Sequence, residues 1–153
     1  MSLENKSANL DESRIRSLRE QAAHAAKHAY APYSHFHVGA ALLLEDGHVI
    51  TGCNVENASY RLTTCAEQAA IARAVVERGS HVRIVAVAVA NEDATIACQP
   101  CGACRQTIAE FAAPTCRIFF PAEHGEPGEC TLADLLPASF NAQSLQQAAS
   151  KSS

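Results

Sequence analysis

Apolar residues recur at helical spacing in the first part of the chain. Between residues 11 and 29 they share one face of a predicted helix: Ile15, Leu18, Ala22, Ala25 and Ala29. Asp11 is a suitable N-cap for this helix. Ala31-Pro32 should end it, because the residue before a proline avoids helical backbone angles.

Shorter apolar runs predict strands. Residues 38–44 and 49–55 flank Asp46-Gly47, a dipeptide that favours a tight hairpin turn. Residues 84–90 read IVAVAVA, a continuous apolar run typical of a strand that is buried on both faces. We therefore expect this run in the centre of a sheet.

Two further helices separate the later strands. Residues 64–78 are rich in alanine and end at Gly79, and residues 101–112 form a helix that Pro114 stops. Residues 116–120 form another strand, and residues 131–136 a short final element before Pro137. This order predicts an α/β fold in which helices cover both sides of a mixed sheet.

We find no linker or repeat, so the chain is expected to form one domain with an ordered core over about residues 11–140. Residues 1–10 and 144–153 are polar and are expected to fray.

Charge and composition exclude several classes of protein. The 153 residues carry a formal net charge of -4, with a pI of about 5.9. A nucleic-acid-binding protein of this size usually presents a basic face, and a small ligand is the better expectation here. No apolar run is long enough to span a bilayer, and the first residues lack the apolar stretch of a secretory signal. Seven cysteines, crowded in part between residues 98 and 104, fit metal binding in the cytoplasm better than disulfides.

The segment Pro100-Cys101-Gly102-Ala103-Cys104 has the spacing that lets two thiolates bind one metal ion. Both cysteines fall near the start of a predicted helix, where the helix dipole favours negative charge. Cys65 has the same position in the preceding helix, within Thr64-Cys65-Ala66-Glu67. A C-x-E sequence followed by P-C-x-x-C matches the signature of zinc deaminases, with cysteine in place of histidine.

Other interpretations of the cysteines remain open at this point. Cys53, Cys116 and Cys130 are interpreted as small buried apolar residues. The spacing from Cys98 onward resembles the start of an iron–sulfur motif, but Ile108 stands where that motif needs a fourth cysteine. A closed structural zinc site, with Cys98 or Cys53 as the fourth ligand, would leave no position for water.

Glu67 also has two interpretations. Thr64-x-x-Glu67 is a capping-box pattern, in which the glutamate only satisfies a backbone N–H. Because Glu67 lies two residues from a candidate ligand, its carboxylate can instead approach the metal without binding it. Deamination requires a group that accepts a proton from water and then protonates the ring and the departing amine. We favour this catalytic role.

Several short motifs in one order resemble the small, homotetrameric, zinc-dependent cytidine deaminases. The resemblance extends from about residue 31 to residue 140. Besides the two cysteine motifs, it rests on these stretches of the chain: Ala31-Pro32-Tyr33-Ser34, Phe36-His37-Val38-Gly39-Ala40, Asn54-Val55-Glu56-Asn57-Ala58-Ser59-Tyr60, Arg105-Gln106, and Leu135-Leu136-Pro137-Ala138-Ser139-Phe140.

The resemblance implies a three-layer αβα sandwich with a mixed, mostly five-stranded sheet, and one Zn²⁺ per subunit. It implies Cys65, Cys101 and Cys104 as zinc ligands and Glu67 as the catalytic residue. The substrate-binding residues that it implies are Phe36 against the base, Asn54 and Glu56 on the ribose, and the Ala66 N–H on the base edge. It also implies that Ala58, Tyr60 and Phe140 reach a neighbouring subunit's pocket.

The chain departs from the family pattern at two positions. Arg61 replaces a glycine, and Gln68 stands where many members with three thiolates have an arginine. Three thiolates leave a zinc site with a net charge of about -1, which weakens the pull of the ion on water. Helix dipoles, Arg61 or Arg105 would then have to offset this charge.

The resemblance implies hydrolytic deamination of cytidine and 2′-deoxycytidine to the uridines, with release of ammonia, in pyrimidine salvage. A deaminase of a related aminopyrimidine, a nucleic-acid editor and a non-catalytic domain built around a structural zinc are the alternatives. The Asn54/Glu56 pair favours a nucleoside, and the absence of a basic face disfavours a nucleic acid.

Overall fold

The computed structural model describes residues 10–151 and contains a five-stranded mixed sheet. Its strands, in the order β2-β1-β3-β4-β5, have these bounds: β1 Val38–Leu44, β2 Val49–Cys53, β3 Ile84–Asn91, β4 Ala112–Pro121 and β5 Pro127–Thr131. The β3 and β4 strands pair in parallel, and the other neighbours pair antiparallel. The apolar run that predicted a central strand is the central strand.

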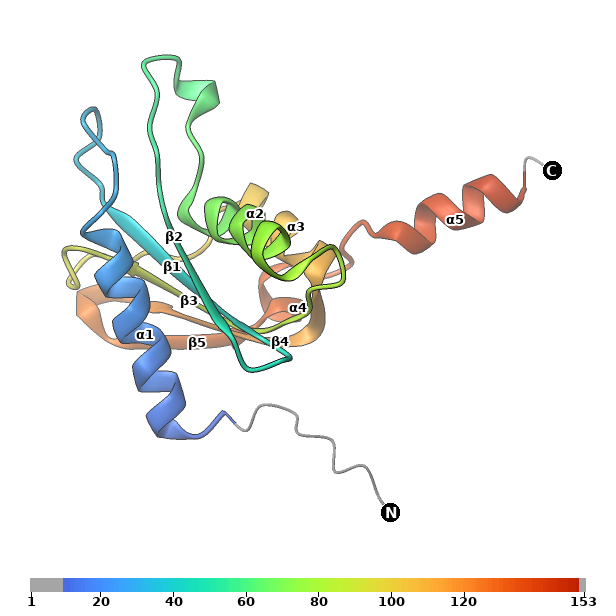
Figure 1. The fold of residues 1–153 in the computed structure, drawn as a ribbon, viewed down its shortest axis with the longest axis horizontal. Coiled ribbons are helices and arrows are strands. Elements are labelled where there is room, and N and C mark those ends of the chain that lie inside the picture. Colours follow the sequence, from blue (N-terminus) through green and yellow to red (C-terminus); the bar gives the residue numbers. More distant parts are fainter. Residues whose placement is uncertain (1–9, 152–153) are drawn as a thin grey trace.

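Helices cover both faces of the sheet (Figure 1). They have these bounds: α1 Glu12–Ala26, α2 Ala66–Arg78, α3 Gly102–Phe111, α4 Leu132–Leu135 and α5 Ala142–Ser150. Leu18 and Ala22 of α1 pack with Leu43 and Phe119 on one face. Buried residues of α2, α3 and α4 share a second core with alternate residues of β1 and β3 on the other face. The predicted αβα fold class is therefore confirmed.

Two predicted elements, the first helix and the second strand, end earlier than expected. The α1 helix ends at Ala26 instead of residue 29, because the amides of His28 and Ala29 bond carbonyls only three residues back, at Ala25 and Ala26. The second strand ends at Cys53 instead of residue 55. The Asn54 amide oxygen accepts the Val38 N–H, so a side chain takes the place of a backbone partner there.

The region after α3 differs more from the prediction. Pro114, expected to follow the helix in a loop, lies within β4, which begins immediately after Phe111. The register with β3 shifts between Ala112 and Arg117, and this irregularity accommodates a residue that has no N–H to donate. No strand was predicted at β5, because Pro127–Thr131 is short and lacks alternating apolar residues. It forms by pairing with the edge of β4.

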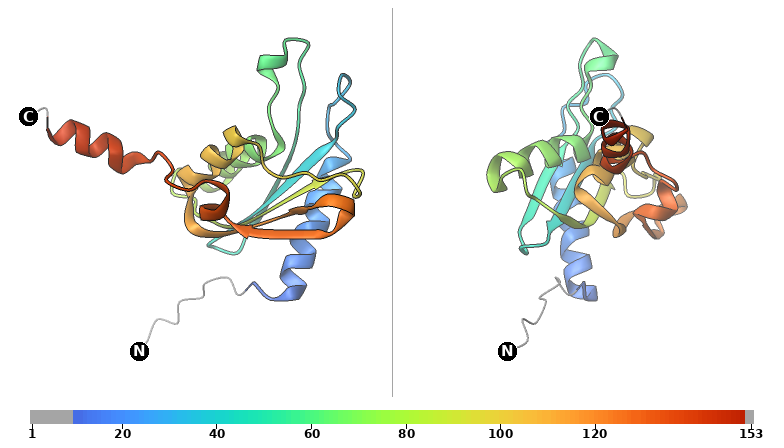
Figure 2. Two further views of the ribbon diagram at one scale, coloured as in Figure 1. Left: turned by 180° about the vertical axis from the view of Figure 1, so that it is seen from behind. Right: turned by 90° about the vertical axis from the view of Figure 1, so that its right-hand side faces the viewer.

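Most of residues 144–153, for which fraying was predicted, lie in a helix that the sequence did not predict. Residues 142–150 form α5, for which the Asn141 side chain accepts the Gln143 N–H as an N-cap. Figures 1 and 2 show α5 extending away from the sheet, and none of its residues is buried. The expectation for residues 1–9 lies outside the described residues. No helix in the described part of the chain is long and apolar enough to cross a membrane.

Two segments project together beyond one end of the sheet, and the second of them leads into α2. The first segment is residues 30–37 and the second is residues 54–64 (Figure 1). The second segment contains a short 3₁₀ helix at Tyr60–Leu62. The Tyr33 and Tyr60 rings meet edge to face, with their centroids 6.3 Å apart. The two segments frame the cavity described next.

Candidate metal centre and active site

Two helix N-termini bring three sulfur atoms together. Cys65 is the N-cap of α2 and Cys101 is the N-cap of α3, and neither side chain makes a capping hydrogen bond. Cys104 lies in the first turn of α3. The sulfurs of these three residues all lie within 4.8 Å of one another, and the Cys65 and Cys101 sulfurs are 3.9 Å apart. The predicted convergence of the cysteines is therefore seen in the structure.

The donor set fits zinc. Zn–S bonds of about 2.3 Å in a tetrahedron place sulfurs about 3.8 Å apart, close to the Cys65–Cys101 separation. Among the described residues, no other cysteine, histidine or carboxylate joins this group. Cys98 and Cys53 both lie outside it, which disfavours a closed site with four cysteines. Three protein ligands leave one position for water or substrate, as in catalytic zinc sites.

The three thiols do not ionise alike. A hydrogen-bonding interaction with the Cys104 side chain lowers the pKa of Cys65 to about 6 against the opposing effect of burial. The same interaction, together with burial and the Glu67 carboxylate, raises the pKa of Cys104. Cys101 is exposed. Metal binding would release the protons that the thiols carry.

Glu67 lies beside this cluster. Glu67 is only 4% exposed, and its Oε2 atom lies 3.4 Å from the Cys104 sulfur. Burial raises the pKa of the Glu67 carboxyl, which suits a group that both accepts and donates a proton near neutral pH. Thr64 is not the N-cap of α2, and its N–H bonds Val55 instead, so the capping-box interpretation of Glu67 is wrong.

A cavity of about 290 Å³ opens onto the sulfurs and Glu67. The four predicted substrate residues of this chain, Phe36, Asn54, Glu56 and Ala66, all line it. It is also lined by Cys98, which the sequence offered as a possible metal ligand, and by three polar residues for which the sequence indicated no role: Ser34, Thr63 and Gln99. Gln99 directly precedes the Pro100-Cys101 motif, and this adjacency is the signal that could have identified it.

Asn54 and Glu56 are held by the loop that carries Phe36. The Asn54 Oδ1 atom accepts the Val38 N–H and its Nδ2 donates to the Phe36 carbonyl, each at 2.9 Å. The Glu56 Oε1 atom accepts the N–H groups of Tyr33 and Ser34 at 3.0 and 3.1 Å. Hydrogen bonds from the Ser34 hydroxyl and these amides lower the pKa of Glu56. The carboxylate of Glu56 is therefore an ionised acceptor at the cavity wall.

Ala58, Tyr60 and Phe140 do not line this cavity. All three are exposed, Tyr60 by 76% and Phe140 by 60%. Their predicted contribution to a neighbouring subunit stays a prediction.

Among the described residues, no arginine hydrogen-bonds the three sulfurs. Arg105, one of the predicted candidates, donates from Nε to the Pro100 carbonyl and from Nη1 to the Leu135 carbonyl. Arg61 is exposed on the 3₁₀ helix. Among the described residues, the hydrogen bonds of the three sulfurs involve only one another and Glu67. The N-termini of α2 and α3 supply a positive field at the site.

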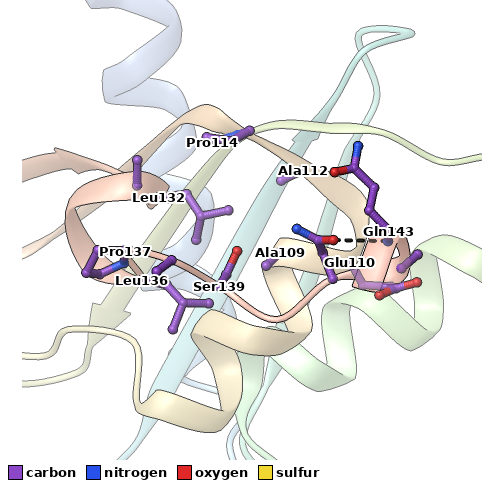
Figure 3. A pocket seen from close by; sticks show the side chains of 13 residues that line it. Ala109, Glu110, Ala112, Pro114, Leu132, Leu136, Pro137, Ser139 and Gln143 are labelled. Atoms are coloured by element: carbon purple, nitrogen blue, oxygen red, sulfur yellow. Dashed lines mark hydrogen bonds between the residues drawn. The ribbon is translucent and has the colours of Figure 1, made fainter. Parts of the chain in front are cut away.

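A larger cavity of about 580 Å³ lies elsewhere, between the end of α3, α4 and the start of α5 (Figure 3). Small and apolar residues line most of it, and Glu110 is its one ionisable residue. Because it holds no cluster of reactive groups, we assign the chemistry to the smaller cavity.

Comparison with known proteins agrees with this assignment. Residues 12–120 match the family model described as the cytidine and deoxycytidylate deaminase zinc-binding region. The chain belongs to the cytidine deaminase family. The zinc-binding region of this family covers all three sulfurs and Glu67, so the predicted zinc cofactor is confirmed and the three cysteines are its candidate ligands.

The similarity extends over most of the chain. A cytidine deaminase from Halalkalibacterium halodurans is 44% identical over 128 residues, which cover 84% of this chain and 95% of that protein. The crystal structure of a mutant cytidine deaminase from Mycobacterium tuberculosis has a TM-score of 0.74 at 41% identity, covering 85% of this chain and 97% of that one. For the enzyme from Burkholderia pseudomallei the TM-score is 0.73 at 43% identity, covering 82% of this chain and 98% of that one.

Proposed function

We propose that this chain catalyses the hydrolytic deamination of cytidine and 2′-deoxycytidine to uridine and 2′-deoxyuridine with release of ammonia, as a cytoplasmic enzyme of pyrimidine salvage. One observation carries the proposal. A buried glutamate touches a cluster of three sulfurs at the bottom of a cavity whose wall offers polar groups suited to a nucleoside.

Cys65, Cys101 and Cys104 would hold the zinc ion, which would supply a Lewis acid that makes water easier to deprotonate. Glu67 accepts a proton from the attacking water and passes it to the ring nitrogen next to the reacting carbon. A second proton transfer through Glu67 lets the amino group leave as ammonia while the carbonyl of the uracil ring forms. Water and cytidine are consumed, uridine and ammonia are produced, and Glu67 ends in its starting state.

The rest of the cavity would orient the substrate. The base packs against Phe36, and the Ala66 N–H, at the first position of α2 and without an intrahelical acceptor, bonds its polar edge. Asn54 and Glu56 bind the ribose hydroxyls. An ionised Glu56 suits a neutral sugar and would repel a phosphate, which favours nucleosides over nucleotides and polymers.

We further propose that the chain forms a homotetramer with one zinc ion per subunit. In this assembly Ala58, Tyr60 and Phe140 contact a neighbouring subunit's cavity. The exposure of Tyr60 and Phe140 supports this arrangement, since large apolar groups left bare on a monomer commonly mark an interface.

The test is the loss of cytidine absorbance on mixing with the purified protein, together with the zinc content. Glu67→Gln should abolish turnover and still bind one zinc ion. Full activity of this variant would overturn the assignment of Glu67. Zinc without an exchangeable fourth ligand, and no turnover, would identify a structural-zinc domain instead.

A second comparison tests nucleoside recognition. Glu56→Gln should lower kcat/KM for cytidine by roughly 10- to 100-fold, because the site loses a charged hydrogen-bond acceptor. Glu92→Gln removes another partly exposed carboxylate, paired with His37, and serves as the matched control. Preferred turnover of the free base by the wild-type chain would favour a related aminopyrimidine deaminase.

A further inference from the structure

Two consecutive side chains of α3 hold the C-terminal segment against the helix that carries two of the sulfurs. Arg105 follows Cys104 directly, and its guanidinium donates to the Pro100 carbonyl at 2.8 Å and to the Leu135 carbonyl at 3.0 Å. The Gln106 side-chain amide donates to the Phe140 carbonyl at 2.9 Å. These contacts lie outside the metal cluster and outside the cavity that we assign to the substrate.

The two carbonyls bonded by Arg105 both lack helical partners. Pro100 is fully buried and precedes Cys101, the N-cap of α3, so its carbonyl lies outside the helix. Leu135 is the last residue of α4, where carbonyls have no intrahelical donor. The planar guanidinium can bond both at once with fixed geometry, which a lysine ammonium on a flexible stem cannot match. Arg105 therefore joins the turn that carries Cys101 to the end of α4.

Gln106 connects α3 to the next part of the C-terminal segment, at Phe140. The segment from Leu136 leads to Phe140, whose ring is exposed and whose carbonyl is bound by Gln106. This hydrogen bond anchors the backbone of Phe140 to α3.

We propose that Arg105 and Gln106 are positioning residues that couple the metal-binding turn to the segment bearing Phe140. Arg105 holds Cys101 through the Pro100 carbonyl and supports residues 136–140 through the Leu135 carbonyl. Gln106 holds only Phe140. This coupling rests on the proposed function. It makes α3 the element through which the zinc-binding turn of one subunit and the substrate cavity of a neighbouring subunit influence each other.

The experiment measures zinc release to a chromogenic chelator and the kcat and KM for cytidine, using the full chain. Arg105→Ala should release zinc about 10- to 100-fold faster than wild type, as is typical when a residue supporting a metal ligand is lost. Arg105→Lys should be intermediate. Gln106→Ala should raise KM roughly three- to tenfold and leave kcat and zinc release unchanged.

Matched controls separate coupling from a general loss of contacts. Arg73→Ala also removes an arginine that bonds a backbone carbonyl, that of Thr51, and Gln21→Ala removes an exposed glutamine. Neither should change zinc release or KM. In a double-mutant cycle, Gln106→Ala should raise the KM of the Phe140→Ala variant by less than about twofold. The reason is that both substitutions act through the Phe140 side chain.

Zinc release from both Arg105 variants at the wild-type rate would overturn the link to the metal turn. Independent effects of Gln106→Ala and Phe140→Ala on KM would overturn the link to Phe140. If circular dichroism shows that Arg105→Ala is unfolded, Arg105→Lys decides the first link. If the wild-type chain does not deaminate cytidine, the proposed function fails, while zinc release still decides the role of Arg105.

Discussion

The Cys104 sulfur lies 3.4 Å from the Glu67 carboxylate, so a candidate zinc ligand directly contacts the group that we propose to move protons. Both side chains are buried, and they come from different helices. Because ionised sulfur and ionised carboxylate repel each other at this distance, metal binding and the protonation of Glu67 must be coupled.

Removal of single thiols should separate metal ligands from other cysteines of the cavity. Cys104→Ala is expected to reduce bound zinc well below one per chain, because two sulfurs form a much weaker site than three. Cys98→Ala should keep one zinc per chain, since Cys98 lines the same cavity but lies outside the sulfur cluster. Atomic absorption after dialysis provides the measurement. Loss of zinc from Cys98→Ala would contradict the three-sulfur assignment.

Gln68 lies at the start of α2 and supplies no charge to the sulfurs, so adding a cation there should change the reaction's dependence on pH. In Gln68→Arg, the guanidinium would offset the negative charge of three thiolates and lower the pKa of the group whose ionisation limits activity in acid. The acidic side of the activity–pH profile should then move to lower pH. Gln68→Met is the uncharged control. Superimposable profiles for the arginine variant and wild type would show that this position is neutral.

Asp46, in the hairpin between β1 and β2, should contribute to acid sensitivity. The His48 N–H and the Arg78 guanidinium lower the pKa of Asp46 to about 2. A carboxyl whose pKa is depressed by folding stabilises the protein above its unfolded pKa of about 4 and loses this contribution as the pH falls toward 2. The pair is exposed, so the contribution is at most about 1 kcal/mol.

Asp46→Asn should therefore lose less stability than wild type between pH 4 and pH 2. Urea unfolding at several pH values measures this. An equal loss of unfolding free energy in both proteins would contradict the prediction.

Gly52 lets α2 approach β2 closely. A Cβ atom at Gly52 would lie 2.5 Å from the Ala70 nitrogen and 2.7 Å from the Ala66 carbonyl oxygen. Gly52→Ala should therefore displace α2 and destabilise the fold by about 1–3 kcal/mol, as overpacking of a core does. It should also weaken zinc binding, because Cys65 caps this helix.

Gly102→Ala is the matched control for this substitution. No atom lies within 4 Å of a Cβ at Gly102, so its effect on thermal unfolding should stay within about 0.5 kcal/mol. Equal stability of the two variants would show that α2 can shift without cost.

Local patterns predicted most of the elements. The continuous apolar run of β3, the Asp-Gly turn and the alanine-rich α2 all have strong local preferences that agree with their tertiary positions. The β5 strand and α5 were missed for opposite reasons. The β5 strand has weak local preference and depends on pairing with β4, whereas α5 is a polar helix that buries nothing.

By itself, the sequence determined which chemistry was available: three cysteines at helix starts and a glutamate two residues after one of them. Only the tertiary structure decided that Cys65 and Cys101, 36 residues apart, lie 3.9 Å from each other while Cys98 is left out of the cluster. It also decided that Arg105 bonds the carbonyls of Pro100 and Leu135 instead of bonding the sulfurs. Spacing along the chain constrains only residues that are close in sequence. The packing of α2 and α3 on the same face of one sheet determines which of their side chains meet.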